Sequence, residues 1–577
     1  MGWGASHPFE IRDTRSGMKV LRTLSGSGMR DAGYLASRDP HPAFFYLCLM
    51  KRAAILLLTI FVPCLLVGQI VYQDLTNTNI YDFIDELAND RIISITSVIK
   101  PYPRELIAQK LLEASSADNR NKLSKRQQKE LDFYLRDFNT ELKPDLSYIT
   151  KNSFFKNKQY FRLSFNPLEF VYKDSLFTFV LKPVFGVSYV RNENGSAYHR
   201  WNGAEIFGYV GKHFGFYASL RDNHENHLLT GPQMLNQEEG AVWKPYPDGA
   251  GDYSEMRGGL TWKWKWGDLA FVKDHFTWGD NYHGSNIMSG RTPSIPYLQY
   301  HMKPLRWMEF TWVQAWLVSE VPDTTKTYTL PTGAKRITYF NKYYASGMFT
   351  FKPLAGLDLS IGNSVVYCAA YMNPAYISPF LFYFKYGYAE GDGKSGYYGK
   401  EVQTFINISS RNIKHLHLYA DVFVNQANVE GISYKIGCRM LDVGLKNLSI
   451  TAEYTRNNGK AYASALPTTS YESNQYSLGS YLKENSMEIY AALCWKPIRG
   501  LRFDASYLFA KHGEGTTLST LDYKDQEIAV AAKYEVINNA YVFVEYLRRQ
   551  VEGDVRFIPA VYFGNTNSLL AGINIGF

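Results

Sequence analysis

The chain has few cysteines and no apolar run of the length that a membrane-spanning helix needs. Only five cysteines occur in 577 residues. The apolar run at residues 53–67 is shorter than the roughly 20 residues of a spanning helix, and the mean hydropathy is −0.27. The three cysteines after this run, Cys368, Cys438 and Cys494, do not have zinc-ligand spacing. These absences exclude a helical membrane protein, and they predict neither a metal nor another cofactor.

Enzyme signatures are also missing. The sequence contains no Gly-x-Ser-x-Gly, no P-loop and no dinucleotide-binding fingerprint. Two Asp and His pairs, Asp274 with His275 and Asp280 with His283, could act as acid and base. No serine or second carboxylate with a suitable spacing joins either pair. The sequence therefore predicts a protein that is not an enzyme, with a hydrolase at the rim of a barrel as an alternative.

Aromatic residues, in contrast, are abundant. Phe, Trp and Tyr make up 16% of the chain, including 44 Tyr and 35 Phe. A membrane β-barrel places such amphipathic rings in girdles at both membrane interfaces. The net charge of +8 is small for this length and lies partly in the first 52 residues. It therefore does not indicate nucleic-acid binding.

From about Leu163 onward, apolar and polar residues alternate with a period of two, as in a strand with one apolar face. The last segment has apolar residues at Leu569, Ala571, Ile573, Ile575 and Phe577. A final strand that ends on Phe resembles the signal read by the barrel assembly machinery of the outer membrane. Gly572, Ile575 and Phe577 have the spacing of that signal. Alternation alone also fits a soluble sandwich, whose polar face lies outside.

Loop lengths separate these two folds. Short turns are expected at residues 173–175, 211–213, 266–268, 303–305, 352–356, 411–414, 444–447, 496–500, 537–539 and 565–567. Longer polar segments run between them, at residues 191–202, 222–254, 276–294, 320–334, 368–400, 457–485 and 512–524. Short connections at one end and long ones at the other are typical of an outer-membrane barrel.

The first 142 residues are organised differently. Residues 1–49 show no periodic pattern and are expected to be a non-native upstream extension. Residues 50–68 have the layout of a signal peptide, with Lys51 and Arg52 before an apolar run that ends near Gly68. Residues 74–142 are expected to form a helical bundle, in which Ser124 and Gln127 make a capping box. The barrel is expected over residues 160–577.

The long segments carry aromatic rings among Asp, Asn, Gln and Gly residues. Aromatic faces stack on the C–H surfaces of sugars, while amide and carboxylate groups hydrogen-bond sugar hydroxyls. This composition predicts a polysaccharide-binding surface. Its candidate residues are Trp243, Tyr246, Tyr253, Trp278, Tyr282, His283, Tyr397 and Tyr398.

Residues 276–297, FTWGDNYHGSNIMSGRTPSIPY, resemble the Trp-Gly, Gly-Ser and Ser signature of the capsule assembly Wzi family. The matching positions are Trp278, Gly279, Gly284, Ser285 and Ser289. Further similar segments lie at residues 83–87, 100–104, 339–348 and 450–455. The resemblance implies an outer-membrane barrel of about 18 strands with a periplasmic helical bundle. It also implies a lumen occluded by loops and a surface that binds capsular polysaccharide.

Together these observations predict an all-β fold: an antiparallel outer-membrane β-barrel of about 18 strands, within about 16 to 20, preceded by a small periplasmic bundle of α-helices. The predicted function is that of a monomeric, non-catalytic lectin that anchors exported capsular polysaccharide or exopolysaccharide. Expected partners are polysaccharide, outer-membrane lipid, the barrel assembly machinery and capsule export proteins, without nucleic acid. A diffusion or uptake porin is the alternative, because a wide barrel can enclose an aqueous channel.

Overall fold

The computed structural model describes residues 69–142, 161–377, 399–426, 430–513 and 522–576. The predicted upstream extension (1–49) and signal peptide (50–68) lie outside these residues. The predicted ligand residues Tyr397 and Tyr398 also lie outside them, as does Phe577 of the predicted assembly signal.

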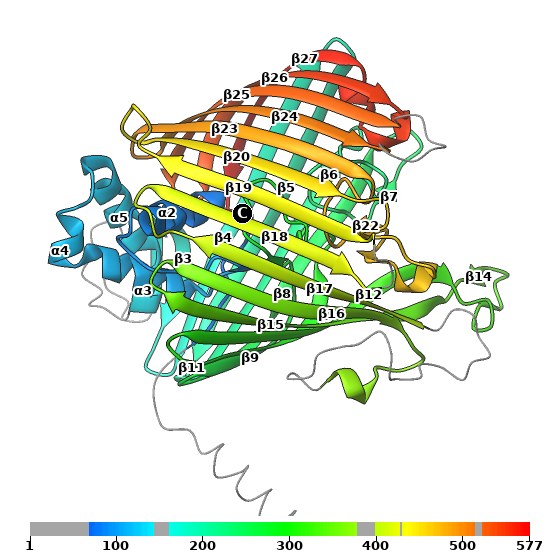
Figure 1. The fold of residues 1–577 in the computed structure, drawn as a ribbon, viewed down its shortest axis with the longest axis horizontal. Helices are drawn as coiled ribbons and strands as arrows, with labels where there is room; N and C mark the ends of the chain where they lie inside the picture. Colours follow the sequence, from blue (N-terminus) through cyan, green and yellow to red (C-terminus); the bar gives the residue numbers. More distant parts are fainter. Residues whose placement is uncertain (1–68, 143–160, 378–398, 427–429, 514–521, 577) are drawn as a thin grey trace, which may run out of the picture. The chain divides into compact units, whose positions relative to one another are not determined.

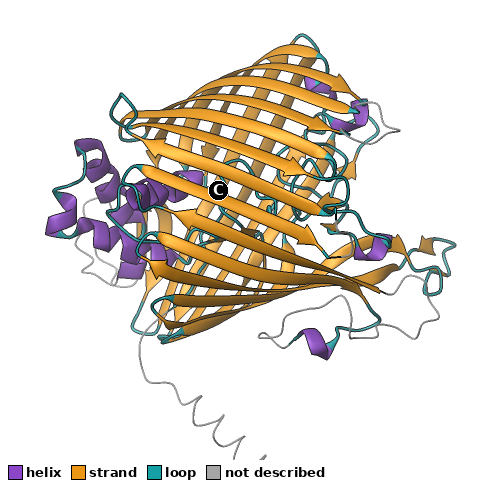
Figure 2. Ribbon diagram, viewed as in Figure 1, coloured by secondary structure: helices purple, strands orange, loops and turns teal. Residues whose placement is uncertain are grey.

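In the described part of the chain, 18 antiparallel strands close into a barrel (Figures 1 and 2). Neighbours in the wall are neighbours in sequence, and the last strand pairs with the first, where Gly572 lies opposite Ser188. The strands are β4 (Phe177–Asn192), β5 (Gly195–Val210), β6 (Phe214–Glu225), β8 (Gly251–Trp264), β9 (Gly267–Asp274), β11 (Ile295–Leu305), β12 (Met308–Pro322), β15 (Tyr339–Leu354), β16 (Leu357–Cys368), β17 (Gly399–Ser410), β18 (Leu416–Asn425), β19 (Ile432–Leu441), β20 (Leu448–Asn457), β23 (Ser486–Ile498), β24 (Leu501–His512), β25 (Tyr523–Ile537), β26 (Ala540–Gly553) and β27 (Asn565–Ile575).

The wall has apolar residues outside and polar residues inside. On β18, Leu418 and Val422 are exposed by 44% and 38%, whereas His417 and Asp421 are buried at 2% and 1%. A soluble sandwich has the opposite arrangement, because its core is apolar and its surface polar. The distribution fits a barrel with lipid outside and a polar interior. The predicted all-β antiparallel barrel of about 18 strands is therefore confirmed.

Some predicted connections differ from the structure, and one predicted turn belongs to a hairpin outside the closed wall. Residues 565–567 belong to β27 and form no turn, and residues 193–194, not 191–202, connect β4 to β5. Polar residues suit a loop, but a barrel strand also places polar side chains in the lumen. The predicted turn at 173–175 follows β3 (Leu168–Lys173), which pairs with β2 (Phe161–Phe165) and with only the first part of β4. This hairpin is therefore an addition to the closed wall.

The N-terminal helices lie against the end of the barrel that carries the connections 411–415, 442–447, 499–500 and 538–539, here called the short-turn end (Figure 1). They are α2 (Thr78–Asn89), α3 (Arg104–Ser115), α4 (Ala117–Arg120), α5 (Lys125–Asp137) and α6 (Asn139–Leu142). Phe83 and Leu87 of α2 pack with Leu131 of α5 in one apolar core. The predicted capping box of Ser124 and Gln127 is present at the start of α5. Among the described residues, no helix is long and apolar enough to cross a membrane.

Residues 275–294, here called the inner loop, leave the wall and fold toward the N-terminal segment. β9 ends at Asp274, and β11 begins opposite it at Ile295. The neighbouring strand β8 is longer: it begins at Gly251 and pairs with β9 from Gly258 onward. Within the inner loop, β10 (Thr277–Trp278) pairs with β1 (Ile99–Lys100). Trp278 is fully buried, within 6 Å of the Phe405 ring of the wall. The barrel interior therefore contains segments from two distant parts of the chain.

Candidate functional site

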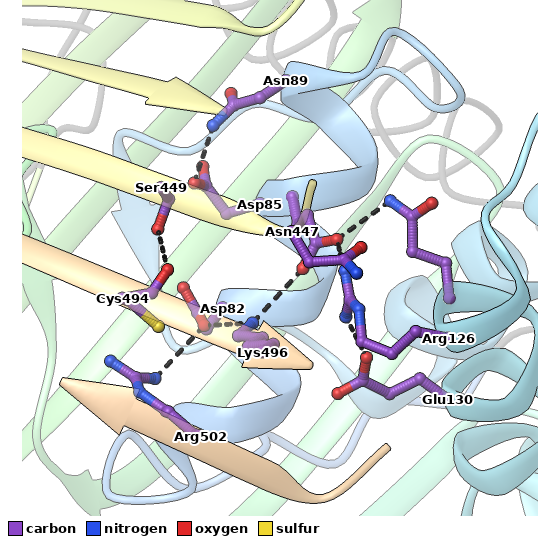
Figure 3. A network of polar contacts seen from close by, with 12 residues as sticks. Asp82, Asp85, Asn89, Arg126, Glu130, Asn447, Ser449, Cys494, Lys496 and Arg502 are labelled. Atoms are coloured by element: carbon purple, nitrogen blue, oxygen red, sulfur yellow. Dashed lines mark hydrogen bonds and ion pairs between the residues drawn. The ribbon is translucent and has the colours of Figure 1, made fainter. Parts of the chain in front are cut away.

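One face of α2 carries three carboxylates that meet cations of the barrel wall. Figure 3 shows one of them, Asp82, beside Lys496 and Arg502. Asp82, Asp85 and Glu86 share this face because residues three and four apart lie together on a helix. The opposite face carries Ile80, Phe83, Ile84 and Leu87, which are buried in the helical core. The amphipathic pattern thus places an acidic face of α2 against the short-turn end of the barrel.

Asp82 binds three cations from three strands. Its carboxylate lies 2.5 Å from Arg439 Nη2 of β19, 2.5 Å from Lys496 Nζ of β23 and 3.2 Å from Arg502 Nη1 of β24. Burial raises the pKa of the Asp82 carboxyl, but the three cations more than compensate and hold it well below its usual range. Asp82 therefore remains ionised and links α2 to the wall.

Asp85 connects α2 to both the wall and the inner loop. Arg411 Nη2, just after β17, lies 2.7 Å from its Oδ1, and the hydroxyl of Tyr282 donates to its Oδ2 at 2.7 Å. The guanidinium of Arg439 also lies over the Tyr282 ring, 4.8 Å from its centre. Burial and then the Asp85 charge hold the pKa of the Tyr282 hydroxyl well above 10. This hydroxyl therefore remains a donor at physiological pH.

The inner loop is fixed by its own serines and glycines. Ser285 Oγ donates to the carbonyl of Trp278 and accepts the Ile287 N–H at 3.0 Å. Gly279 has a φ of +98°, and a Cβ at this position would lie 2.8 Å from Ser285 Oγ. Ser289 Oγ donates to the carbonyl of Leu478 at 3.2 Å. The residues that resemble the Wzi signature, with Gly284 at a φ of +71°, thus shape the loop inside the barrel.

Asp280 and His283 bind different partners. Ser97 Oγ donates to Asp280 at 2.5 Å and Asn407 Nδ2 donates at 3.2 Å. The His283 ring lies 3.2 Å from Glu488 through Nδ1 and stacks on the Tyr490 ring at 4.1 Å. Both residues therefore attach the inner loop to its surroundings, and they bind separate partners rather than pairing with each other as acid and base.

Within the described part of the chain, two cavities of several hundred Å³ lie inside the barrel. Cavity A, of about 730 Å³, lies beside α2 and is lined by Asp82, Asp85, Tyr282, Arg439, Arg502 and Lys533, among others. Cavity B, of about 440 Å³, lies toward the long-loop end and is lined by Tyr189, His199, Arg221, Tyr253, Tyr562 and Arg549, among others. Gln237, Glu239, Phe543 and Glu545 line both cavities. The two spaces therefore meet at a shared set of side chains.

The predicted ligand residues are divided between these places. Tyr253 lines cavity B, stacks on the His199 ring at 6.2 Å and meets the Trp243 ring edge to face at 4.5 Å. Tyr246 is an exposed loop residue whose hydroxyl donates to Asp252 at 2.5 Å. Trp278 is enclosed by protein, and the Tyr282 hydroxyl is bound to α2. Among the predicted ligand residues, Tyr253 and His283 thus line cavity B, whereas Tyr282 lines cavity A.

Charges of both signs surround cavity B. Arg549 pairs with Asp525 and, at 2.8 Å, with Glu527, while Arg221 lies 2.6 Å from Glu239. Further carboxylates in the lining are Glu225, Glu238 and Glu545. Because the two arginines are already paired with carboxylates, the formal charge of the remaining side chains in this lining is negative.

Sequence reasoning missed the acidic face of α2 and its cations. Asp82, Asp85 and Glu86 have the spacing of one helix face, which is the only local signal. Their partners are distributed over several strands, where each reads as one polar residue in an alternating pattern.

Comparison with known proteins agrees with this architecture. The structure is similar to Wzi of Escherichia coli, an outer-membrane protein described as a carbohydrate-binding β-barrel involved in group 1 capsule assembly. The identity is 11%, the match covers 88% of this chain and 100% of that chain, and the TM-score is 0.53. The chain has the fold of an outer-membrane β-barrel.

More distant barrels also match. OccAB1 of Acinetobacter baumannii is 10% identical over 68% of this chain and 95% of its own, with a TM-score of 0.40. OprD of Pseudomonas aeruginosa is 12% identical over 69% and 94%, with a TM-score of 0.37. No protein-family model and no curated protein matches the sequence.

Proposed function

We propose that this barrel is a surface lectin of the Wzi type in the outer membrane, which holds exported polysaccharide at its long-loop end without chemical turnover. The proposal depends mainly on how the barrel interior is occupied: α2 enters it from the short-turn end and the inner loop from the long-loop end. α2 and the inner loop meet through Asp85 and Tyr282, and cavity B lies on the long-loop side of this contact. The carbohydrate binding described for Wzi, whose fold this chain shares, agrees with this role.

Cavity B supplies groups that recognise sugars. The rings of Tyr253 and His199 give the lining an aromatic part, and the carboxylates of Glu225 and Glu545 can accept hydrogen bonds from sugar hydroxyls. Because its arginines are paired with carboxylates, the lining favours neutral or amino sugars over uronic acids. Weak contacts to single sugars add up along a repeating polymer.

A glycan array probed with the detergent-solubilised protein tests this proposal. We expect retention of polymers with neutral or amino sugars. Retention of uronic-acid polymers alone would contradict the assignment of the ligand to cavity B. Absence of binding to every polysaccharide would contradict the lectin function itself.

A porin is the second candidate, because cavities A and B share four lining residues and so mark a possible path through the barrel. Planar-bilayer conductance separates the two functions. A lectin whose lumen is filled by α2 and the inner loop should be nearly silent, whereas a steady open conductance of the unmodified protein would favour uptake.

The proposed orientation follows from the loops. Short turns face the periplasm in outer-membrane barrels, which would place the helices α2 to α6 there, within reach of capsule export proteins. The barrel assembly machinery would read Gly572 and Ile575 on β27, together with Phe577. Lipid would cover the apolar outer face, which includes Leu569 and Ile573.

A further inference from the structure

Three side chains from separate parts of the chain converge where the inner loop begins. Glu239 belongs to the connection between β6 and β8, Glu255 to β8, and His275 follows β9 directly. His275 Nε2 lies 2.9 Å from Glu239 Oε1 and 3.4 Å from Glu255 Oε1. One donor atom from each residue lies within 4.8 Å of the other two. The three atoms thus surround a common point.

Neighbouring groups orient two of these side chains toward that point. His275 Nδ1 lies 3.1 Å from the carbonyl oxygen of Gly290. Since a carbonyl only accepts, Nδ1 carries a proton, and Nε2 is the nitrogen that faces the carboxylates. Arg221 Nη2 binds Glu239 Oε2 at 2.6 Å, which leaves Oε1 toward His275. Such outer partners are typical of metal-binding histidines and carboxylates.

The convergent atoms are buried and incompletely satisfied. His275 and Glu255 are only 8% and 6% exposed. Among the described residues, neither His275 Nε2 nor Glu255 Oε1 has a hydrogen-bond partner of acceptable geometry. Two carboxylate oxygens beside one imidazole nitrogen require a positive charge between them. A metal ion or a proton on Nε2 can supply that charge.

We propose that Glu239, Glu255 and His275 bind a divalent transition-metal ion of the zinc class where cavities A and B meet. One imidazole and two carboxylates form a donor set that suits Zn²⁺ or Mn²⁺. Ca²⁺ takes six to eight oxygen ligands, so this set does not favour it. Three protein ligands leave a coordination position open, and Glu239 lines both cavities. A group of a bound molecule can therefore complete the coordination from either side.

Isothermal titration of the full-length protein in detergent, after chelator treatment, tests the site with ZnCl₂, MnCl₂ and CaCl₂. We expect one Zn²⁺ per chain, weaker Ca²⁺ binding, and at least a tenfold loss of Zn²⁺ affinity in Glu255→Gln and in His275→Gln. His301→Gln is the matched control, because the His301 imidazole faces the Asp268 carboxylate at 2.8 Å outside this cluster. This control should bind Zn²⁺ as the unmodified protein does.

Two results would overturn the proposal. The first is no Zn²⁺ binding by the unmodified protein, which would mean that a proton on His275 supplies the positive charge. The second is unchanged Zn²⁺ binding by both site variants. If the variants fail to fold, X-ray absorption of the zinc-loaded unmodified protein decides. One imidazole nitrogen and carboxylate oxygens about 2.0 Å from the metal support the site, whereas a shell without imidazole contradicts it. Neither measurement involves polysaccharide, so this proposal and the lectin function can fail independently.

Discussion

Asp82 of α2 and Arg439 of β19 form an ion pair of 2.5 Å that joins the N-terminal helices to the barrel wall. Lys496 lies at the same distance from this carboxylate. Arg439 and Lys496 are both buried, so water cannot solvate their charges well. The Asp82 carboxylate balances these charges instead. The position of α2 in the barrel entrance thus depends on ionic contacts rather than on an apolar interface alone.

Asp82→Asn should release α2 from the wall. The substitution removes the anion that Arg439, Lys496 and Arg502 share, and breaking a buried ion pair costs about 3 kcal/mol. Each cation keeps one other carboxylate, on Asp85, Glu86 and Asp504 respectively. We expect higher conductance in planar bilayers and faster proteolysis of the helices, while the barrel itself remains folded. Asp132→Asn is the matched control, because Asp132 binds Arg120 at 2.8 Å on the exposed surface of α5. Equal conductance in both variants would refute the role of Asp82.

Acid should have the same effect as this substitution. Although burial raises the pKa of the Asp82 carboxyl, its three cations lower it well below 3.8, and those around Asp85 lower the pKa of that carboxyl too. A group whose pKa is lower in the folded state contributes its full stabilisation above its unfolded pKa, and this contribution is lost progressively as pH falls from there through the folded pKa. We therefore expect conductance to stay low near neutral pH, to begin to rise below about pH 4 and to keep rising at still lower pH.

The double variant Asp82→Asn, Asp85→Asn provides the comparison for the acid experiment. Its conductance should be high already at neutral pH and should change little on acidification. A rise of similar size in the variant and in the unmodified protein below about pH 4 would assign the acid effect to other carboxylates.

Local patterns were sufficient to predict the elements of the fold. The capping box at Ser124 sets the start of α5, and the alternation along β18 identifies a strand with one apolar face. Alternation could not say which face lies outside, and the sorted loop lengths supplied that information. The strand limits near 191–202 were harder to predict, because polar residues fit a loop and a lumen-facing strand equally well.

The interior could be predicted only in part. The motif around Trp278 was recognised, but its placement inside the barrel depends on pairing with Ile99 and on Ser97, which no local signal announces. His275 was considered as a partner of Asp274, its neighbour in sequence. In the structure its imidazole faces Glu239 and Glu255, from distant segments. Such clusters require the three-dimensional path of the chain.

Gly279→Ala should displace the inner loop. Gly279 has a φ of +98°, and its Cβ would lie 2.8 Å from Ser285 Oγ. A left-handed backbone conformation alone costs about 1–2 kcal/mol for a residue with a Cβ, and the crowding adds to this cost. We expect the barrel to remain resistant to detergent on unheated gels, but with a lower melting temperature and a noisier conductance. Gly249→Ala is the control, because Gly249 has a φ of +87° with nothing within 4 Å of its Cβ position. Equal melting temperatures for the two variants would show that the crowding is relieved without displacement of the loop.

Tyr253→Ala should weaken polysaccharide binding by about tenfold, which corresponds to about 1.4 kcal/mol. The Tyr253 ring lines cavity B beside His199, and its loss removes an aromatic face from that lining. Tyr253→Phe keeps that face and should retain most of the affinity, whereas Tyr328→Ala, in an exposed hairpin between β12 and β15, should have no effect. Affinity is measured with the polymer that the glycan array selects. If Tyr253→Ala binds as tightly as Tyr328→Ala, the sugar contacts lie outside cavity B, and the long loops alone would have to hold the polymer.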